Sequence, residues 1–589
     1  MTSCRRMRHR RSAMALEVGY RPAALLWLCA SCAGHAGARM VPSDDAAVHP
    51  GAQPRPTAAG RQMTRFTTSA ITAHDLILRL SIVADDSMAG RAAGSPGARR
   101  TQRYIEAELR RMGLVPAGDA GSYAQAIPMV HRGVSAASTL VASGRSLVLW
   151  SDFVPMPWAW RTPPIDGVPV VYGGVLGDTT RSIDPAAVAG KFVILRGFAG
   201  RSVFPRFGPG DPLSRAVALA VTGLEGMIPA RLDRIREGLD AGVSGNPNLS
   251  RSAPASLLIT EAAAAALLGR PLDGAAVGAE GPPVRGSIVF ADTVLPLCCN
   301  VVAVIPGSDP GLSREYVALG AHLDHIGTLP EPIDHDSARA ANARLWSLRG
   351  RSSAGRADAD AAARIAIGLD SLRALRGLRP DSIFNGADDD GSGVVALLEI
   401  AESVMAMSVK PRRSLVFVWH TGEEEGNQGS FWFTERPPVP LESLIAQLNV
   451  DMVGRGSRED IARGGPRYLQ VIGSRRLARG LGDLIEDVNR ARPEPLDLDY
   501  EFDPPGDPRA LYCRSDHAEY ARHGIPIAFF TTGEHPDYHQ VTDEVEYINF
   551  PHLATVTGFI QDIAIRLANL SARPIRQAPK PDPREPCRP

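Results

Sequence analysis

Seven side chains that could bind divalent metal ions or accept protons are spread along the second half of this 589-residue chain. Most of them stand where an apolar run ends. In chain order they are His322, Asp324, Asp389, Glu423, Glu424, Asp451 and His539. Two divalent ions need about this many imidazole and carboxylate groups, including one carboxylate that is left free to act as a base. The ordered set therefore predicts the site of a two-metal hydrolase.

His322 and Asp324 are separated by one residue and follow the apolar run 316–319. After a strand ends, this spacing lets His322 face a metal while Asp324 accepts a hydrogen bond from the other imidazole nitrogen, which fixes the tautomer. Taken alone, the pair is also typical of a structural histidine near a turn. His325 competes with His322 for the role of ligand.

Two runs of acidic residues need an explanation for how their charges are compensated. Residues 388–390 are three aspartates in a glycine-rich turn that opens a helix. A helix N-terminus stabilises one or two acids, but three adjacent carboxylates repel one another. Residues 423–425 are three glutamates, of which one could bind a metal while its neighbour accepts a proton. A cation explains both runs, and a solvated acidic loop is the alternative for the glutamates.

Asp451 and His539 complete the candidate set. Asp451 follows the apolar run 444–450, where an unpaired carboxylate would be costly, so it is a metal ligand or a hydrogen-bonded structural residue. His539 lies in a polar loop after the run 525–530, where an exposed loop histidine is the alternative. Three nearby histidines are interpreted as structural residues or as supports for the ligands: His517, His523 and His535.

The composition disfavours several classes of function. Hydrophobic residues make up 44% and charged residues 22% of the chain, as in ordinary globular proteins. The formal net charge is zero, so no nucleic-acid partner is expected. Lysine occurs only at positions 191, 410 and 580, which disfavours Schiff-base or lysine-base chemistry.

The first 38 residues have the organisation of an export signal. Arginines between residues 5 and 11 precede the apolar run 22–33, and residues 36–38 (Ala-Gly-Ala) resemble a cleavage site. We therefore predict a signal peptide over 1–38 and an exported protein, periplasmic or extracellular. A lipid anchor at Cys32 is the alternative. The apolar run is too short to span a bilayer comfortably, and no transmembrane segment is expected elsewhere.

The region between the predicted signal and residue 295 has three parts. Residues 39–69 are rich in Ala, Pro, Gly and Thr and indicate a flexible leader. A helix is expected over 98–112, where apolar residues form one stripe, and Gly113 follows as its C-cap. Residues 135–295 contain no histidine and are interpreted as an inserted, β-rich accessory domain. The elements expected there are strands at 147–149, 168–172 and 191–195 and helices at 215–223 and 260–268.

From residue 300 the pattern alternates between strand, loop and helix. Buried strands are expected at 301–305, 316–319, 414–419, 444–450 and 525–530. A helix is expected over 393–407, directly after the turn that contains Asp389. This alternation predicts an α/β fold with a mixed, largely parallel central sheet flanked by helices, in which ligands bind beyond the carboxyl ends of the strands. Residues 331–380 interrupt the pattern as a helical insertion or a lid.

Four cysteines remain beyond the predicted cleavage site. They are Cys298, Cys299, Cys513 and Cys587. Four are too few for a disulfide scaffold, and their spacing is not that of a zinc motif. The adjacent pair begins a strand-like run, so we interpret both residues as packed thiols.

The ordered metal-binding residues resemble those of the co-catalytic zinc exopeptidases, which include the bacterial leucyl aminopeptidases and the glutamate carboxypeptidases. Further segments match in family order: Met88–Gly97, Asn385–Gly393, Asn449–Gly454 and Ser515–His517. The resemblance covers about residues 70–130 and 296–570. It implies the zinc exopeptidase fold and two Zn(II) ions.

The resemblance also implies a domain organisation. The peptidase domain would consist of residues 70–134 and 296–572, with the helical insertion 331–380, and a Pro-rich tail would follow at 573–589. Residues 135–295 resemble the protease-associated domain that is often inserted in this family. This second match rests chiefly on the segments Ala189–Leu195 and Pro254–Ile259.

Carried over by position, the resemblance assigns a role to each candidate. The implied ligands are His322 and Asp451 for one zinc, Glu424 and His539 for the other, and Asp389 as the bridge. Glu423 becomes the general base and acid, and Asp324 orients His322. Tyr512 is expected to stabilise the oxyanion. The peptide bond after the bridging aspartate is expected to be cis.

The function implied is that of a secreted zinc aminopeptidase that acts on peptides or small proteins. Surplus acids at positions 388, 390 and 425 are expected to attract the α-ammonium group of the substrate. Two other enzymes share the fold: a carboxypeptidase, which needs an arginine for the substrate carboxylate, and a glutaminyl cyclase, which uses one zinc. A non-catalytic binding protein is disfavoured by the complete ligand set and by Glu423. The oligomeric state is left open.

Overall fold

The computed structural model describes most of the chain beyond residue 66. The described residues are 67–157, 162–176, 178, 183–197, 212–227, 243–245, 253–295, 298–348, 377–461, 463–507, 509–583 and 587. The predicted signal peptide and nearly all of the predicted leader lie outside them, as do residues 349–376 of the predicted insertion. Within the described part, no helix is long and apolar enough to cross a membrane.

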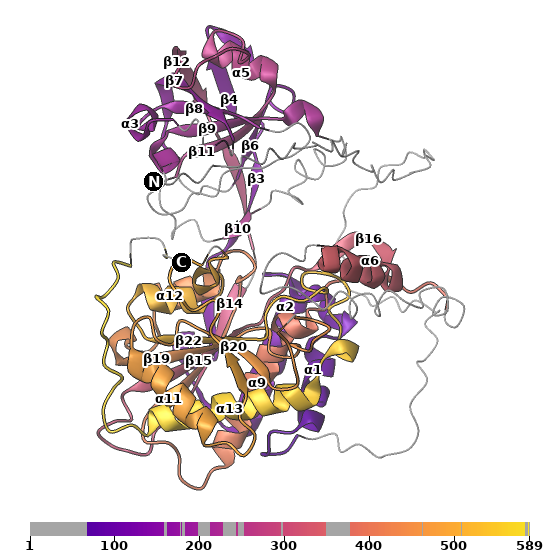
Figure 1. Cartoon of the computed structure of the whole chain (residues 1–589), viewed down its shortest axis with the longest axis vertical. Coiled ribbons are helices and arrows are strands. Elements are labelled where there is room, and N and C mark those ends of the chain that lie inside the picture. Colours follow the sequence, from indigo (N-terminus) through magenta and orange to yellow (C-terminus); the bar gives the residue numbers. More distant parts are fainter. Residues whose placement is uncertain are drawn as a thin grey trace, which may run out of the picture. The chain divides into compact units, whose positions relative to one another are not determined.

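A nine-stranded mixed sheet forms the centre of the α/β fold (Figure 1). Its strands lie in the order β1 (Val115–Pro116), β14 (Cys298–Ile305), β18 (Ser414–His420), β15 (Tyr316–His322), β19 (Leu444–Val450), β22 (Ile527–Thr531), β20 (Tyr468–Ile472) and β21 (Asp497–Asp499), while β2 (Ala124–Ile127) also pairs with β14. The middle strands β18, β15, β19 and β22 are mutually parallel. On one side β14 pairs with β18 in antiparallel orientation, and on the other side β20 pairs with β22 in the same way. The predicted mixed sheet and its five strands are confirmed, and four of its eight strand pairs are parallel.

Helices cover both faces of this sheet. Successive residues of β15 show the division, because Val317 and Leu319 belong to one hydrophobic core and Ala318 belongs to another. The first core includes α1 (Ala73–Val83), α2 (Pro96–Met112), α9 (Gly393–Ala406), α11 (Arg479–Arg490) and α13 (Phe550–Ala568). The second includes α10 (Gln428–Glu435) and α12 (His517–Arg522). The predicted helices 98–112 and 393–407 match α2 and α9, and Gly113 ends α2 in the left-handed conformation.

A separate eight-stranded sheet occupies the predicted insertion 135–295. Its order is β5 (Arg145–Leu147), β4 (Thr139–Ala142), β12 (Glu280–Ser287), β7 (Ile165–Val175), β8 (Phe192–Arg196), β9 (Ala218–Thr222), β11 (Ala255–Ile259) and β6 (Phe153–Met156). Two helices accompany it, α3 (Pro185–Val188) and α5 (Glu261–Leu268), and a three-stranded sheet contains β10 (Val243–Gly245), β3 (Val130–Val134) and β13 (Phe290–Val294). The strands expected at 168–172 and 191–195 and the helix expected at 260–268 are present, whereas only residue 147 of the strand expected at 147–149 lies in β5.

The helix predicted at 215–223 is wrong. Residues 218–222 form β9, which pairs in parallel with β8 and β11 and is buried along its whole length. A short apolar run that is buried on both sides has neither a helical nor a strand period, so its neighbours in the fold decide its conformation.

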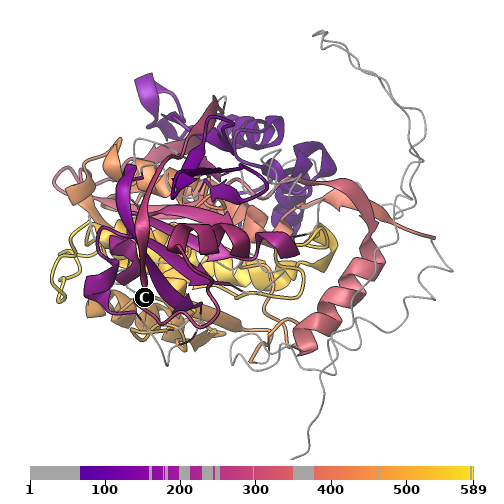
Figure 2. The ribbon, with the colours of Figure 1, turned by 90° about the horizontal axis from the view of Figure 1, so that it is seen from above.

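The predicted insertion 331–380 begins and ends in a two-stranded ribbon. In this ribbon β16 (Thr328–Asp334) pairs with β17 (Pro380–Ile383), and α6 (His335–Leu348) follows β16 directly. Figure 2 shows the ribbon and α6 from above. The expectation of helical structure in this insertion holds for 335–348.

The cysteines divide into two pairs. Cys298 and Cys299 are buried free thiols, as expected. Cys513 and Cys587 form a disulfide that ties the C-terminal segment to the short helix η7 (Leu511–Cys513). The sequence analysis missed this bond because its partners are 74 residues apart and only the fold brings them together.

Candidate metal centre

The carboxyl ends of four neighbouring parallel strands meet at one edge of the central sheet. His322 ends β15, Glu424 follows β18, Asp451 follows β19, and His539 lies in the loop after β22. Asp389 comes from η5 (Ala387–Ser392), the turn that leads into α9. All five candidate ligands therefore converge where parallel sheets place their binding sites.

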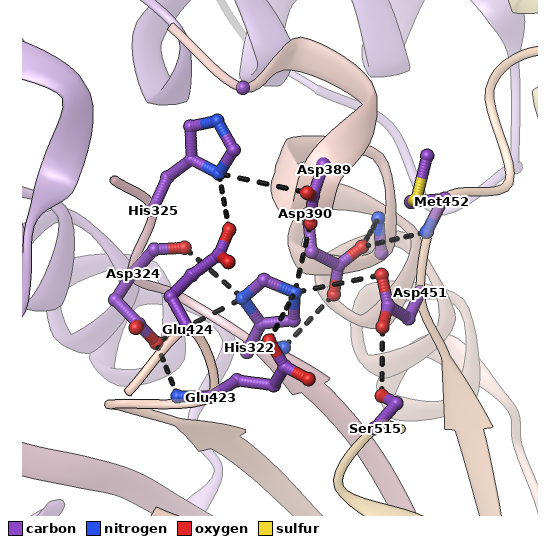
Figure 3. A network of polar contacts seen from close by, with 12 residues as sticks. His322, Asp324, His325, Asp389, Asp390, Glu423, Glu424, Asp451, Met452 and Ser515 are labelled. Atoms are coloured by element: carbon purple, nitrogen blue, oxygen red, sulfur yellow. Dashed lines mark hydrogen bonds and ion pairs between the residues drawn. The ribbon is translucent and has the colours of Figure 1, made fainter. Parts of the chain in front are cut away.

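The ligand atoms form two groups that share Asp389. Figure 3 shows the first group, around His322. In the first, His322 Nε2 lies 3.1 Å from Asp389 Oδ1 and 3.5 Å from Asp451 Oδ1. In the second, His539 Nε2 lies 3.1 Å from Asp389 Oδ2 and 3.0 Å from Glu424 Oε2. Each oxygen of Asp389 thus faces a different group, which is the geometry that a bridging ligand needs.

The donor set fits a pair of zinc ions. Imidazole nitrogen and carboxylate oxygen are the ligands that zinc takes in hydrolytic sites. The buried atoms His322 Nε2, Asp451 Oδ1 and His539 Nε2 make no hydrogen bond within the described part of the chain, and neither does Asp389 Oδ2. Buried polar atoms are rarely left without partners, so atoms that face one another in this way are suited to hold a cation.

The pKa shifts of the candidate ligands also indicate a site for cations. Burial opposes the charged form of His322, but Asp451 and Asp389 raise its pKa well above its usual value. Burial opposes it in His539 too, yet contacts with Asp389 and Glu424 raise its pKa to about 11. Burial and the neighbouring Asp389 favour the protonated form of Glu424. Contacts with His325 and His539 outweigh them and lower the pKa of Glu424 to about 2. The site therefore attracts positive charge between its carboxylates.

Glu423 and Glu424 have different surroundings although they are adjacent. His325 Nδ1 lies 2.7 Å from Glu424 Oε1. This histidine therefore belongs to the second ligand group, for which the resemblance implied only Glu424, His539 and the bridging Asp389. Glu423 Oε2 lies 3.9 Å from His322 Nε2. Burial raises the pKa of Glu423 well above its usual value, so this carboxyl holds a proton more readily than a solvent-exposed glutamate does.

Asp324 supports His322 through a different atom from the one expected. His322 Nδ1 lies 3.1 Å from the backbone carbonyl oxygen of Asp324 and 3.9 Å from the carboxylate. The carboxylate instead accepts a hydrogen bond from the backbone N–H of Glu423 at 3.3 Å. The residue thus contacts both His322 and the Glu423 loop.

The bridging turn is held by buried acids. The Asp389–Asp390 peptide bond is cis, which confirms the expectation from the resemblance. The Asp390 carboxylate accepts hydrogen bonds from the backbone N–H groups of His322 and Gly393, both at 2.9 Å. The Asp543 carboxylate accepts one from the N–H of Asp389 at 3.1 Å. Asp390 is therefore engaged with the backbone, and its expected attraction of the substrate's α-ammonium group stays a prediction.

Asp388 is likewise engaged. Its Oδ1 accepts a hydrogen bond from the backbone N–H of Gly454 at 2.6 Å, and its Oδ2 lies 3.3 Å from Nε2 of the buried His535. His517 stacks on Phe529, with ring centroids 4.5 Å apart. Both histidines thus have the supporting or structural positions that the sequence suggested.

Arg91 is a supporting residue that the sequence analysis did not single out. Its side chain is fully buried, and its guanidinium donates to the carbonyl oxygens of Leu323 at 3.1 Å, Gly386 at 2.9 Å and Asp389 at 3.4 Å. It also donates to that of Asn385. The Arg91 guanidinium thereby links the chain beside His322 to the bridging turn. The available signal was its place in the segment Met88–Gly97.

Ser515 holds the other side of the first ligand group. Its hydroxyl donates to Asp451 Oδ2 at 2.7 Å and accepts from Asn449 Nδ2 at 2.8 Å. These bonds orient Asp451 so that its second oxygen faces His322.

The tyrosine beside the ligands is Tyr538, not Tyr512. Tyr512 is buried on the second face of the sheet, with its ring 4.1 Å from the guanidinium carbon of Arg476. Tyr538 stacks directly on His539, with ring centroids 4.0 Å apart. The resemblance placed a tyrosine near the Ser515 segment, but the fold turns Tyr512 into the core.

A pocket lies beside Asp451 and is lined by Met452, Phe529 and Tyr538 among others. Arg509 and Arg514 also line it, and they pair with Glu534 at 3.0 and 2.8 Å. The pocket therefore offers both apolar surface and charged groups to a substrate that reaches the ligands.

The candidate metal centre lies within a segment that matches a family model. The sequence model of peptidase family M28 matches residues 300–563. Leucine aminopeptidase 1 of Arthroderma otae is 27% identical over 194 residues, which is 30% of this chain and 48% of the relative. The same figures hold for leucine aminopeptidase 1 of Trichophyton rubrum. The chain thus spans about half the length of these curated relatives.

Solved structures show a partial likeness. An aminopeptidase from Aneurinibacillus sp. strain AM-1 has a TM-score of 0.43 at 17% identity, covering 87% of this chain and 97% of that chain. BSAP, a zinc aminopeptidase from Bacillus subtilis, has a TM-score of 0.40 at 15% identity, covering 85% and 96%.

Proposed function

We propose that the chain is a zinc aminopeptidase of peptidase family M28, whose sequence model matches residues 300–563, and that it removes N-terminal residues from peptides. The curated relatives named above are leucine aminopeptidases, which supports the same direction of attack. The proposal includes export through the signal peptide 1–38 and a protease-associated type of insertion at 135–295.

The observation that carries the proposal is the sharing of Asp389 between two ligand groups. Its two oxygens lie 3.1 Å from His322 Nε2 and 3.1 Å from His539 Nε2. A single ion would need only one such group. The shared carboxylate with Glu423 beside it supports a two-metal hydrolase over the one-zinc cyclase and over a binding protein.

Two zinc ions, when bound, supply Lewis acidity for the substrate carbonyl and lower the pKa of a water molecule. His322 and Asp451 would hold one ion, Glu424 and His539 the other, and Asp389 both. Glu423 takes the proton of the attacking water and delivers it to the leaving amine, for which its raised pKa is suited. The Tyr538 hydroxyl donates a hydrogen bond to the developing oxyanion.

A carboxypeptidase is the second candidate, because Arg509 and Arg514 line the pocket beside Asp451. A substrate carboxylate could bind to such a pair. Both guanidinium groups are already paired with Glu534, so this observation is weaker than the shared bridge.

The deciding experiment compares one peptide with its N-terminus free or acetylated and with its C-terminus free or amidated. We expect cleavage of the free-amine peptide and loss of activity on acetylation, because each lost charge-assisted contact costs roughly 1.5–3 kcal/mol. Amidation should have little effect. Sensitivity to the C-terminal block alone would overturn the aminopeptidase assignment in favour of the carboxypeptidase.

A further inference from the structure

A second cluster of ligand-type side chains lies outside the candidate metal centre. His335, Asp381 and Glu544 each offer one nitrogen or oxygen atom, and these atoms lie within 4.8 Å of one another. His335 is fully buried at the start of α6, and Asp381 is in β17. The proposed peptidase mechanism uses none of these residues.

The hydrogen bonds of His335 define which nitrogen faces the cluster. Its Nε2 lies 3.2 Å from the Tyr547 hydroxyl. In the tautomer that binds a metal through Nδ1, the Nε2–H donates to the phenol oxygen of Tyr547. Nδ1 of a neutral imidazole then turns its lone pair towards Asp381.

The distance between these two groups fits a shared ion. His335 Nδ1 and Asp381 Oδ2 are 3.1 Å apart. Two ligand atoms that each lie about 2.1 Å from one tetrahedral zinc ion are about 3.4 Å apart, which is close to the observed separation. The same separation of 3.1 Å joins His322 Nε2 and Asp389 Oδ1 in the candidate metal centre.

Asn385 and Asp86 extend the cluster. Asn385 Nδ2 donates to Asp86 Oδ1 at 2.9 Å and to Glu544 Oε1 at 3.0 Å, so the amide points among the carboxylates. The Asn385 side chain is buried, with 2% exposure, and its Oδ1 has no hydrogen-bond partner in the described part of the chain. A buried carbonyl oxygen without a hydrogen-bond partner, on an amide that contacts two carboxylates, suits a further ligand for a cation.

We propose that His335, Asp381 and Glu544, assisted by Asp86 and Asn385, form a third divalent-cation site of this protein. The imidazole ligand favours a first-row transition ion such as Zn²⁺ or Mn²⁺ over Ca²⁺ or Mg²⁺. A metal-binding histidine usually donates its other ring N–H to a nearby group, which fixes its tautomer. The Tyr547 hydroxyl is that group for His335.

The position of the cluster indicates what the ion does. His335 and Asp381 stand at the two ends of the predicted insertion, where β16 and β17 pair. Glu544 follows Asp543, whose carboxylate accepts hydrogen bonds from the N–H groups of Asp388 and Asp389. The ion therefore fastens the base of the ribbon to the loop that holds the bridging turn, and it acts by positioning that loop rather than by contact with substrate.

The test is a count of bound metal on the full-length protein, equilibrated with Zn²⁺ or Mn²⁺ and freed of unbound ion. We expect three equivalents in the wild type and two in Asp381→Asn and in His335→Gln. Glu331→Gln, which changes an exposed acid on the same ribbon, should retain three. In the double variant His322→Ala/His539→Ala one equivalent should remain, so the outcome does not depend on the peptidase centre.

A measurement on the unmodified protein guards against variants that fail to fold. Crystals soaked in zinc should give an anomalous-scattering peak between His335 Nδ1 and Asp381 Oδ2. Absence of this peak, two equivalents in the wild type, or three in folded Asp381→Asn would overturn the proposal. So would a third equivalent that binds Ca²⁺ but neither Zn²⁺ nor Mn²⁺.

Discussion

The ring of Tyr538 stacks on the ring of its neighbour His539, with centroids 4.0 Å apart and an angle of 27° between the planes. This stacking fixes the phenol next to a candidate zinc ligand. Burial raises the pKa of Tyr538, and Asp389 and Glu424 raise it further. The hydroxyl therefore stays protonated and remains a hydrogen-bond donor at neutral pH.

Tyr538→Phe should lower kcat by about 10²–10³-fold, the usual loss when one donor to an oxyanion is removed. The zinc content should stay unchanged, because His539 retains its aromatic neighbour. Tyr512→Phe is the matched control, since Tyr512 packs in the core and should leave kcat close to that of the wild type. If Tyr512→Phe lowered kcat and Tyr538→Phe did not, Tyr512 would be the residue that stabilises the oxyanion.

His322→Ala and His539→Ala should each lose bound zinc while the protein stays folded, because each removes the only imidazole proposed for its ion. Elemental analysis gives the zinc content, and circular dichroism reports the fold. His74→Ala, on α1, serves as the control with full zinc content. Full occupancy in both ligand variants would disprove the assignment.

Glu423→Gln keeps the shape of the side chain but removes its proton acceptor. We expect zinc to be retained and turnover to fall by about 100-fold or more, the scale of a lost general acid–base. Glu424→Gln should instead lose zinc, since Glu424 Oε2 lies 3.0 Å from His539 Nε2. If the two variants exchange these results, the two roles are exchanged as well.

Arg91→Met should weaken zinc binding without touching a ligand. The buried guanidinium donates to carbonyl oxygens on both sides of the first ligand group, and each buried carbonyl left unpaired costs about 1–3 kcal/mol. We expect a higher Kd for zinc and a lower midpoint of urea unfolding. Arg100→Met, at an exposed position of α2, should change neither. A wild-type Kd in Arg91→Met would show that the turn is held by other contacts.

Arg79→Met should destabilise the fold at a distance from the site. The buried Arg79 pairs with Glu399 at 2.5 Å and with Glu108 at 2.7 Å, and removing one partner of a buried pair costs about 3–5 kcal/mol. The loss should depend on pH. Burial raises the pKa of Glu399 to about 7, so this carboxyl binds a proton more readily in the folded protein than in the unfolded chain. Stability from this group is present at low pH and is lost as the pH rises through 7. Without Arg79, urea unfolding should show a larger loss at pH 8 than at pH 5, and an equal loss at both would contradict the argument.

The sequence alone determined the types and order of the candidate ligands and the buried strands that precede them. Both signals are local: an apolar run and the polar residue that ends it lie within a few positions of each other. Since parallel strands align their carboxyl ends, the local pattern was enough to expect that His322, Glu424 and Asp451 converge. It also gave the helices α2 and α9.

The tertiary structure decided everything that depends on contacts between distant segments. Only packing shows that Tyr538 lies beside the ligands while Tyr512 is in the core, and that residues 218–222 form a strand. Arg91 reaches carbonyl groups more than 230 positions away, and His335 meets Asp381 and Glu544 from separate segments. No period in the sequence records such contacts, because they result from how the elements pack and from which buried polar atoms must then find partners.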